Sequence, residues 1–377
     1  MSLAKSMEMI GAKLVRAPGL TGEHVRVLLA EAEGNLERIC DPQITGRVDL
    51  PPAARVFLRA PDEAAIAADL AWLRRSGARL ILWGADDYPR QLAATHGPPA
   101  ALYVAGNARL LKAPQLAMVG ARKSSPLGRA IARELAGTLT LAGLTITSGL
   151  AAGIDAASHE GALRADGHTV AVLGTGLDRI YPAENASLAA RIRAAGGALV
   201  SEFPPGAGPQ RQHFPRRNRI ISGLALGTLV IEAAAGSGSL ITAAQALQQG
   251  REVFAVPGSI RNPLSWGCHQ LIRQGAHLVT QASDVLSELQ FNQKIQRLVT
   301  DCRAGSGDPG RLPGAGAPLD KEYEMLLDAL GFEPATIDTL VARSGLSGES
   351  IASMLLILEL EGRIAPYPGG LYGRLSR

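Results

Sequence analysis

The feature that most constrains the fold is an alternation that begins after Trp72-Leu73-Arg74, where short apolar runs are separated by glycine turns and helical stretches. The runs are rich in leucine and β-branched residues, as β-strands are. Strands joined by crossover helices form a parallel sheet that is covered on both faces, which explains why these runs are almost continuously apolar. The pattern therefore predicts an α/β fold with a Rossmann-like, mostly parallel sheet.

The individual elements of this sheet follow from the same alternation. Strands are expected over Arg79–Trp83, Gln115–Val119, Leu144–Thr147, Thr169–Leu173, Ala198–Ser201, Thr228–Ile231 and Glu252–Val256. Helices are expected between most of them, over Gly128–Ala142, Asp155–Ala165, Asn185–Ala195 and Leu240–Gln249.

The flanking sequence predicts two further domains. Residues 1–68 are expected to form an N-terminal helical, SAM-like domain, because helical stretches there are broken by turns such as Pro18-Gly19-Leu20-Thr21. The Rossmann-like domain takes residues 69–295, and residues 296–318 are expected to be a flexible linker, since they offer almost nothing to bury. Residues 319–377 carry three helical stretches and then two short runs around Pro368-Gly369-Gly370, the order of a winged-helix-like domain.

Composition excludes several classes of protein. A chain of 377 residues, 46% hydrophobic and 19% charged, is too apolar for wholesale disorder and long enough for two or three domains. The cysteines Cys40, Cys268 and Cys302 are far apart, so neither a disulfide framework nor a zinc site is expected. No run is apolar and long enough for a signal peptide or a membrane span, so we expect a soluble cytoplasmic protein without a membrane partner. The net charge of +4 tolerates a polyanionic partner without requiring one.

Glycine-rich loops follow four of the expected strands, at the edge where parallel α/β sheets bind ligands. They supply Gly120, Arg122, Lys123 and Ser124, then Ser148, Gly149 and Gly153, then Gly174 and Gly176, and finally Ser237 and Ser239. One such loop is ordinary turn chemistry, but four in succession give a row of amide donors suited to several phosphates. None of the loops matches the NTPase phosphate loop or the dinucleotide fingerprint, so ATP hydrolysis and hydride transfer lose support.

The densest basic run lies between two of the expected strands and contains one aromatic residue. It supplies Arg211, Phe214, Arg216, Arg217, Asn218 and Arg219. Guanidinium groups bind phosphates and an aromatic ring stacks on an unpaired base, so this composition favours a groove for single-stranded nucleic acid. The alternative is a solvated loop whose arginines pair with carboxylates of neighbouring helices.

The motifs in these loops, taken in order, resemble the DNA-processing protein A family from about Tyr88 to Ala282. They are Val119-Gly120-Ala121-Arg122, Ser148 through Asp155, His159, Gly176-Leu177-Asp178 with Tyr181-Pro182, Ser201-Glu202, Phe214 through Ile221, Glu232, Ser237 through Ala243, and Val256-Pro257-Gly258. The resemblance implies a homodimeric protein of natural transformation and recombination, which binds single-stranded DNA without strong sequence preference and loads the RecA recombinase onto it. It implies no catalytic turnover and no cofactor.

The resemblance also implies which residues contact DNA. These are Gly120 and Arg122 in the first loop, Ser148 and Gly149 in the second, and Arg211, Phe214, Arg217 and Asn218 in the basic run. Ala121 stands where a serine is common in the family, which removes one hydroxyl contact.

Three other features suggest chemistry. Glu232 after an expected strand could be the general base of a nucleotide-processing enzyme of the lysine-decarboxylase-like, phosphoribohydrolase type. That type has Pro-Gly-Gly-x-Gly-Thr after the strand, which this chain lacks, so we expect Glu232 to accept hydrogen bonds from loop amides. Asp155 and His159 are expected to form a salt-linked helix face, and Cys268 with His269 lacks the spaced partners of a metal site.

The C-terminal domain lacks the marks of a duplex reader. Its last helical stretch, Ser347–Glu361, carries Glu349, Glu359 and Glu361 and no cation, whereas recognition helices present arginine or lysine to the groove. Its apolar stripe is expected to form the core of the domain: Ile351, Met354, Leu355 and Leu358. We expect this domain to contact protein rather than DNA.

Overall fold

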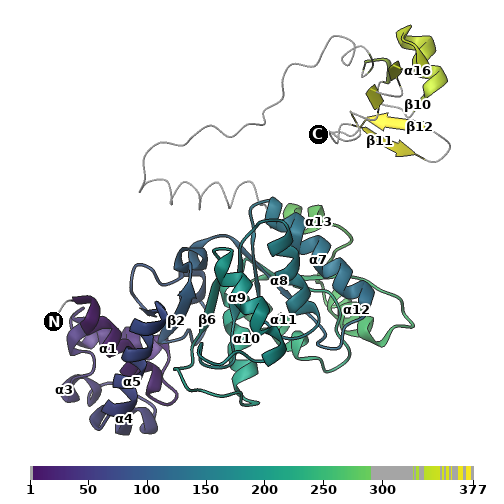
Figure 1. Ribbon diagram of the computed structural model, residues 1–377. Helices are drawn as coiled ribbons and strands as arrows, with labels where there is room; N and C mark the ends of the chain where they lie inside the picture. The colour runs from purple at the N-terminus through teal and green to yellow at the C-terminus, as the bar shows by residue number, and fades with distance from the viewer. Residues whose placement is uncertain are drawn as a thin grey trace. The chain divides into compact units, whose positions relative to one another are not determined.

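The computed structural model describes residues 3–289 and, in the C-terminal part, residues 326, 328–330, 335–348, 350–351, 354–355, 358, 364–367 and 371–374 (Figure 1). The chain divides into two compact units, Met1–Gly305 and Ser306–Arg377. The linker predicted at residues 296–318, Cys302 and much of the predicted helix Ser347–Glu361 lie outside the described residues.

The first unit is built on a nine-stranded sheet with the order β1-β2-β6-β5-β4-β3-β7-β8-β9. The strands are β1 Arg79–Leu82, β2 Ala101–Gly106, β3 Gln115–Val119, β4 Thr145–Ser148, β5 Thr169–Val172, β6 Ala198–Ser201, β7 Gly227–Val230, β8 Glu252–Ala255 and β9 His277–Leu278. All neighbours from β6 to β9 are parallel, whereas β2 runs antiparallel to β6 and to β1. The predicted α/β fold with a mostly parallel sheet is confirmed, and β2 and β9 are additions to it.

Helices cover both faces of this sheet. They are α7 Pro126–Leu141, α8 Ile154–Arg164, α9 Ala186–Ala194, α10 His213–Leu224, α11 Gly238–Gln248, α12 Trp266–Arg273 and α13 Ala282–Glu288. Alternate residues of β3 enter two separate cores, with Ala117 and Val119 packed in the cluster that contains Ile220 of α10. Leu116 and Met118 belong to the cluster that contains Leu135 of α7. The four helices that the sequence predicts are present, whereas the basic run, which gives no helical pattern, forms α10.

The connections of the sheet reverse direction between β3 and β7. From β3 the chain proceeds through α7 to β4 on one side, and it later returns through α10 to β7 on the other side. In open α/β sheets, the crevice at the carboxyl ends of two such strands is the usual ligand site. The fold alone therefore directs attention to the loops after β3 and β7.

Helices from the N-terminal part of the chain pack beside β1 and β2 (Figure 1). They are α1 Leu3–Arg16, α2 Gly22–Glu31, α3 Pro42–Thr45, α4 Pro52–Arg59, α5 Glu63–Ser76 and α6 Arg90–Ala93. Leu14 and Leu28 share a core with Leu82 and Ala101 of the sheet. Arg16 binds the buried Asp69 of α5 through two hydrogen bonds of 2.6 and 2.7 Å. The domain boundary expected after residue 68 lies inside α5, and these helices belong to the same compact unit as the sheet.

The second unit contains a small antiparallel sheet with the order β10-β12-β11. Its described elements are β10 Ala335–Thr336, α16 Ile337–Ser344, β11 Ile364–Tyr367 and β12 Leu371–Arg374. The apolar stripe predicted for its core is buried, with Ile351, Met354, Leu355 and Leu358 packed around Leu340. Within the described residues of both units, no helix is long and apolar enough to cross a membrane.

Candidate nucleic-acid interface

A pocket of about 530 Å³ lies at the crevice between β3 and β7, and we call it the switch-point pocket. Most of its lining comes from the loops after β3 and β7 and from one face of α10, with further residues from the loop after β4, from α8, from α11 and from the turn before α12. The lining residues are Val119, Gly120, Ala121, Arg122, Lys123, Ala151, Asp155, Arg217, Asn218, Ile221, residues 234–239, Thr242 and Leu264. Ser125 caps the start of α7, and Ser237 caps the start of α11. The N-terminus of a helix carries a partial positive charge, so the two helix starts at this crevice favour the binding of an anion.

The two principal loops present backbone donors without acceptors. Among the described residues, none accepts a hydrogen bond from the amides of Arg122, Lys123, Gly236 and Gly238. All four residues line the pocket. Amides without a protein acceptor beside a pocket are suited to binding phosphate oxygens without reading a base.

Glycine at position 120 permits the close approach of the loops around the pocket. A Cβ atom there would lie 2.7 Å from Ile154 Cγ1 and 3.0 Å from the carbonyl oxygen of Glu232. Gly153, which precedes α8, has a φ of +81°, in the region that favours glycine. Both predicted glycines therefore shape the pocket through the backbone.

Glu232 holds the first loop against the end of β7. Its Oε2 atom accepts a hydrogen bond of 2.8 Å from the amide of Ser125, and its Oε1 atom accepts one of 2.5 Å from the Ser125 hydroxyl. The prediction that Glu232 accepts hydrogen bonds from the loop is confirmed. Both carboxylate oxygens are engaged, which disfavours Glu232 as the general base of a nucleotide-processing enzyme.

A buried charge cluster, Asp155, His159 and Arg217, lies at the base of the pocket. Arg217 is 4% exposed, and its Nη1 atom donates to the carbonyl oxygens of Gly149 and Val172. The carboxylate of Asp155 accepts from the amides of Gly149 and Ala151 at 3.1 and 3.4 Å. Arg217 thus connects α10 to the first residue after β4 and to the last residue of β5.

Burial shifts the titration of all three groups. Desolvation lowers the pKa of Arg217 to about 10, against the opposing effect of Asp155, so Arg217 stays protonated at neutral pH. Desolvation raises the pKa of Asp155, against the charge of Arg217 and the loop amides. Desolvation and then the charge of Arg217 lower the pKa of His159 to about 3, so its ring is neutral. His159 Nδ1 lies 2.7 Å from the Thr169 hydroxyl, and the predicted salt link between Asp155 and His159 is therefore wrong.

Cations and aromatic rings lie together at the outer part of the pocket, and we define the rim group as Arg122 and Lys123, which line the pocket, with Phe214 and Tyr181 beside Arg122. Arg211 is exposed just before the start of α10. Arg122 Cζ lies 5.2 Å from the centre of the Phe214 ring. The Tyr181 ring lies 5.6 Å from that of Phe214, and Tyr181 is 45% exposed. Sequence reasoning did not select Tyr181 as a site residue, although Tyr181-Pro182 was one of the family motifs.

Several predicted residues are enclosed by the protein. The Ser148 hydroxyl is fully buried and donates to the Met118 carbonyl oxygen at 2.6 Å. Gly149, Gly174 and Gly176 are also buried. Ser148 and Arg217 both have buried side chains, and Arg217 nevertheless lines the pocket. Their hydrogen bonds within the protein connect neighbouring strands and loops.

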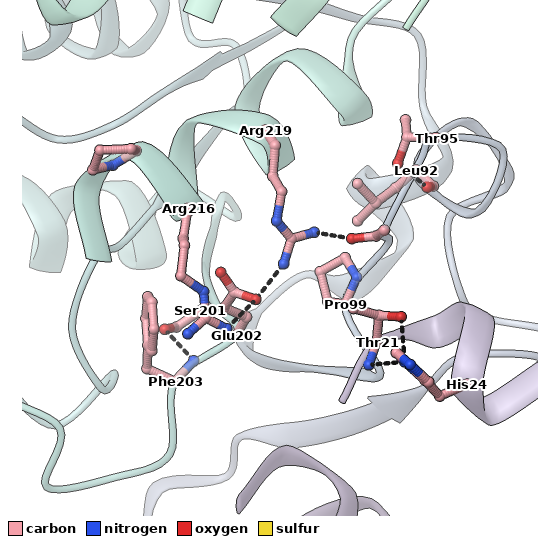
Figure 2. Close-up of polar contacts among 12 residues, drawn as sticks. Thr21, His24, Leu92, Thr95, Pro99, Ser201, Glu202, Phe203, Arg216 and Arg219 are labelled. Carbon is pink, nitrogen blue, oxygen red and sulfur yellow. Dashed lines mark hydrogen bonds and ion pairs between the residues drawn. The ribbon is translucent and has the colours of Figure 1, made fainter. Parts of the chain in front are cut away.

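The remaining predicted residues divide between two locations. Ser237 and Ser239 lie at the start of α11 in the pocket lining, and Ser124 accepts a hydrogen bond of 2.6 Å from Arg129 through its carbonyl oxygen. Arg216 and Arg219 lie on the other face of α10, where both reach Glu202 (Figure 2). These two arginines pair with a carboxylate, as the alternative interpretation expected, but they lie on a helix rather than in a solvated loop, and Glu202 follows β6 rather than lying on a helix.

Comparison with protein families gives two matches along the chain. Residues 79–290 match the family model described as DNA recombination-mediator protein A. Residues 311–370 match the DprA winged helix domain, which agrees with the predicted winged-helix-like domain.

Individual proteins and solved structures are also similar to this chain. Protein Smf from Escherichia coli K12 is 45% identical over 324 residues, which cover 86% of this chain and 84% of that protein. The X-ray structure of DNA processing protein A from Streptococcus pneumoniae has a TM-score of 0.65 and 38% identity, and the match covers 75% of this chain and 97% of that one. The structure of DNA processing protein A from Helicobacter pylori, described for its single-stranded DNA binding mode, has a TM-score of 0.50 and 28% identity over 54% of this chain and 93% of that one.

Proposed function

The chain belongs to the DNA-processing protein A (DprA/Smf) family, and from this premise we propose that it binds single-stranded DNA along the carboxyl edge of its parallel sheet. One observation carries the proposal: the switch-point pocket combines amides that lack protein acceptors with an exposed cationic and aromatic rim. Phosphates are the same in every sequence, so contacts of this kind bind without strong sequence preference. The single-stranded DNA binding described for the Helicobacter pylori relative supports the same assignment.

We assign direct contacts to side chains that are exposed or half-buried and to the backbone amides of the two loops that line the pocket. Arg122, Lys123 and Arg211 pair with phosphates, and the Phe214 ring stacks on a base. The amides of the loops after β3 and β7, including those at Gly120 and Gly238, donate hydrogen bonds to phosphate oxygens, as do the side chains of Asn218 and Ser237. Arg217 positions α10 and adds positive potential from beneath the pocket.

We propose a binding role without catalytic turnover. The phosphoribohydrolase alternative needs a free general base, and Glu232 is engaged by Ser125. The described residues contain no group of three or more side chains that could hold a metal ion. Incubation with nucleoside monophosphates and analysis for a released base tests the alternative, and product formation would contradict the binding role.

We also propose that the protein acts as a homodimer that loads the RecA recombinase onto the bound strand. The description of the matching family as a recombination mediator supports this step. Light scattering with and without oligonucleotide measures the oligomeric state. RecA-dependent ATP hydrolysis on DNA coated with single-strand-binding protein should begin sooner when this protein is added, and an unchanged lag would contradict loading.

Titration with fluorescent oligo-dT at several salt concentrations tests the central proposal. Affinity should fall steeply as salt rises, because each cation–phosphate contact releases a counterion. A duplex of the same length should bind more weakly, since its bases are stacked and cannot reach Phe214. Affinity that is independent of salt would contradict the phosphate contacts.

A further inference from the structure

The face of α10 that turns away from the pocket is bonded to the rest of the protein through Arg219. This side chain is 18% exposed, and its Nη1 atom donates to the Gly97 carbonyl oxygen at 2.6 Å. Its Nη2 atom donates to Glu202, whose side chain is 5% exposed (Figure 2). Arg216 also reaches Glu202, but at 3.4 Å and with half of its side chain exposed. Arg219 is therefore the principal partner of a buried carboxylate.

Gly97 extends this connection into the N-terminal helices. Its amide donates to Glu23 Oε1 of α2 at 3.0 Å, while its carbonyl oxygen accepts from Arg219. Gly97 has a φ of +62°, which favours glycine at this position. The amide of Gly22 donates to the Pro98 carbonyl oxygen at 2.7 Å, beside these bonds. Residues 97–98 are thus bonded on one side to α2 and on the other side to α10.

Close packing limits how far α10 can move at this point. A Cβ atom at Gly223 would lie 2.6 Å from Leu92 and 3.2 Å from Thr95, so α10 approaches α6 and the following loop closely. Gln249 donates to the Arg219 carbonyl oxygen at 3.0 Å. The Arg219 side chain is held on both sides, which makes it unsuited to pairing with a phosphate in the pocket.

We propose that Glu23, Gly97, Glu202 and Arg219, which we call the Gly97 bridge, position α10 so that DNA affinity depends on the attachment of the N-terminal helices. The inference rests on the proposed function of the pocket. Arg217 and Asn218 directly precede Arg219 on α10, so a small rotation of the helix that releases Arg219 also displaces both pocket residues. Coupling between two sites is reciprocal, so the bound strand strengthens the contact between α2 and residues 97–98.

Variants of the full-length protein separate positioning from direct contact. Arg219→Ala should lower oligo-dT affinity about tenfold, because it leaves Glu202 buried without its main partner and frees α10. The slope of log affinity against log salt should stay as in the wild type, whereas loss of a direct phosphate contact lowers that slope by about one. Arg219→Lys keeps the charge and should restore part of the affinity.

A second variant does not disturb a buried charge. Glu23 has a side chain that is 45% exposed. Glu23→Gln replaces the charged acceptor of the Gly97 amide by a neutral oxygen that accepts more weakly, so it should lower affinity about threefold while the melting temperature stays unchanged. Loss of a negative charge alone would strengthen binding to a polyanion, so a fall in affinity reports the bridge. Glu37→Gln, which removes the same charge from an exposed position outside the bridge, is the matched control and should not weaken binding.

Hydrogen exchange measures the reciprocal effect. Oligo-dT should slow amide exchange at Gly22 and Gly97 in the wild type and leave it unchanged in Arg219→Ala. Wild-type affinity in both Arg219→Ala and Glu23→Gln would overturn the bridge while leaving the proposed function intact. A salt slope lower by about one in Arg219→Ala would overturn it too, because Arg219 would then be a phosphate contact. A wild-type protein that did not bind oligo-dT would overturn the proposed function and, with it, this inference.

Discussion

The rim group and the buried charge cluster lie at the same pocket and use the same guanidinium chemistry, yet they differ in what they can do. Arg122 is exposed and its charged end lies over the Phe214 ring, where a phosphate can reach it. Arg217 is 4% exposed, and backbone carbonyl oxygens occupy its Nη1 atom. Burial of the guanidinium group therefore decides whether an arginine at an anion site contacts the ligand or connects parts of the protein.

The two groups also differ in how salt affects them. Mobile ions screen exposed charges over about 8 Å at physiological ionic strength, whereas a charge beneath the protein surface is screened much less. The rim group should therefore account for the salt dependence of DNA binding. The lowered pKa of Arg217, about 10, is still well above neutrality, so this side chain stays protonated. Its contribution to DNA affinity should therefore hardly change with salt concentration.

Arg217→Ala should change the protein more than any other variant considered. Removal of one partner leaves Asp155 and two carbonyl oxygens in a buried space without their cation, so we expect a loss of about 3–5 kcal/mol in the free energy of unfolding. The fraction that stays folded should bind oligo-dT more than tenfold more weakly. Urea unfolding and anisotropy measured on the same sample check both effects. A stable variant with weakened binding would instead place Arg217 with the rim group.

The second prediction concerns acid stability and the buried cluster alone. His159 has a pKa of about 3 in the folded protein, below its ordinary value near 6.5, so the unfolded chain binds the proton first as the pH falls. Stability from this group should be complete above pH 6.5 and lost between about pH 6.5 and 3, by at most about 1.4 kcal/mol per pH unit. His159→Gln can keep a hydrogen bond to Thr169 and should flatten this dependence. An identical pH profile in both proteins would contradict the neutral buried imidazole.

The third prediction separates the rim from the cluster. Arg122→Ala should reduce oligo-dT affinity about tenfold and lower the salt slope by about one, because it removes one phosphate contact. Its melting temperature should stay within a degree of the wild type, since Arg122 is exposed. Arg59→Ala is a control for charge, as Arg59 is exposed on α4 and does not line the pocket. Equal losses in the two variants would mean that overall charge, not the rim, determines binding.

Much of this arrangement was predictable, and the part that was not has a physical cause. β3 was predicted residue for residue, because a strand buried on both faces is apolar throughout. β9 has two residues, which is too short for a pattern to show. The helix α10 was missed because Pro215 and a run of cations resemble a loop, although proline is tolerated in the first turn of a helix.

The loops of the site were predictable and the roles of their side chains were not. Glycine turns after four strands indicated the edge of the sheet at which the pocket lies, because backbone geometry requires glycines there. The sequence does not distinguish the three arginines at positions 216, 217 and 219. Their positions around the axis of α10 place Arg217 at the pocket and the other two at Glu202. From the sequence alone, Arg122 and Arg217 are therefore equivalent candidates. Only the structure shows that one is exposed and the other is buried.

The aromatic part of the rim group should contribute less to DNA binding than its cations, and substitutions of Tyr181 test this contribution. Tyr181→Leu should weaken oligo-dT binding about threefold, because Tyr181 supports the Phe214 ring on which a base stacks. Tyr181→Phe keeps the ring and should bind as the wild type does. An oligonucleotide that lacks bases should bind the wild type and Tyr181→Leu equally, since it offers phosphates alone. If Tyr181→Leu weakened binding of that oligonucleotide as much as binding of oligo-dT, Tyr181 would affect the binding of phosphates rather than the stacking of bases. The rim group would then bind DNA through its cations alone.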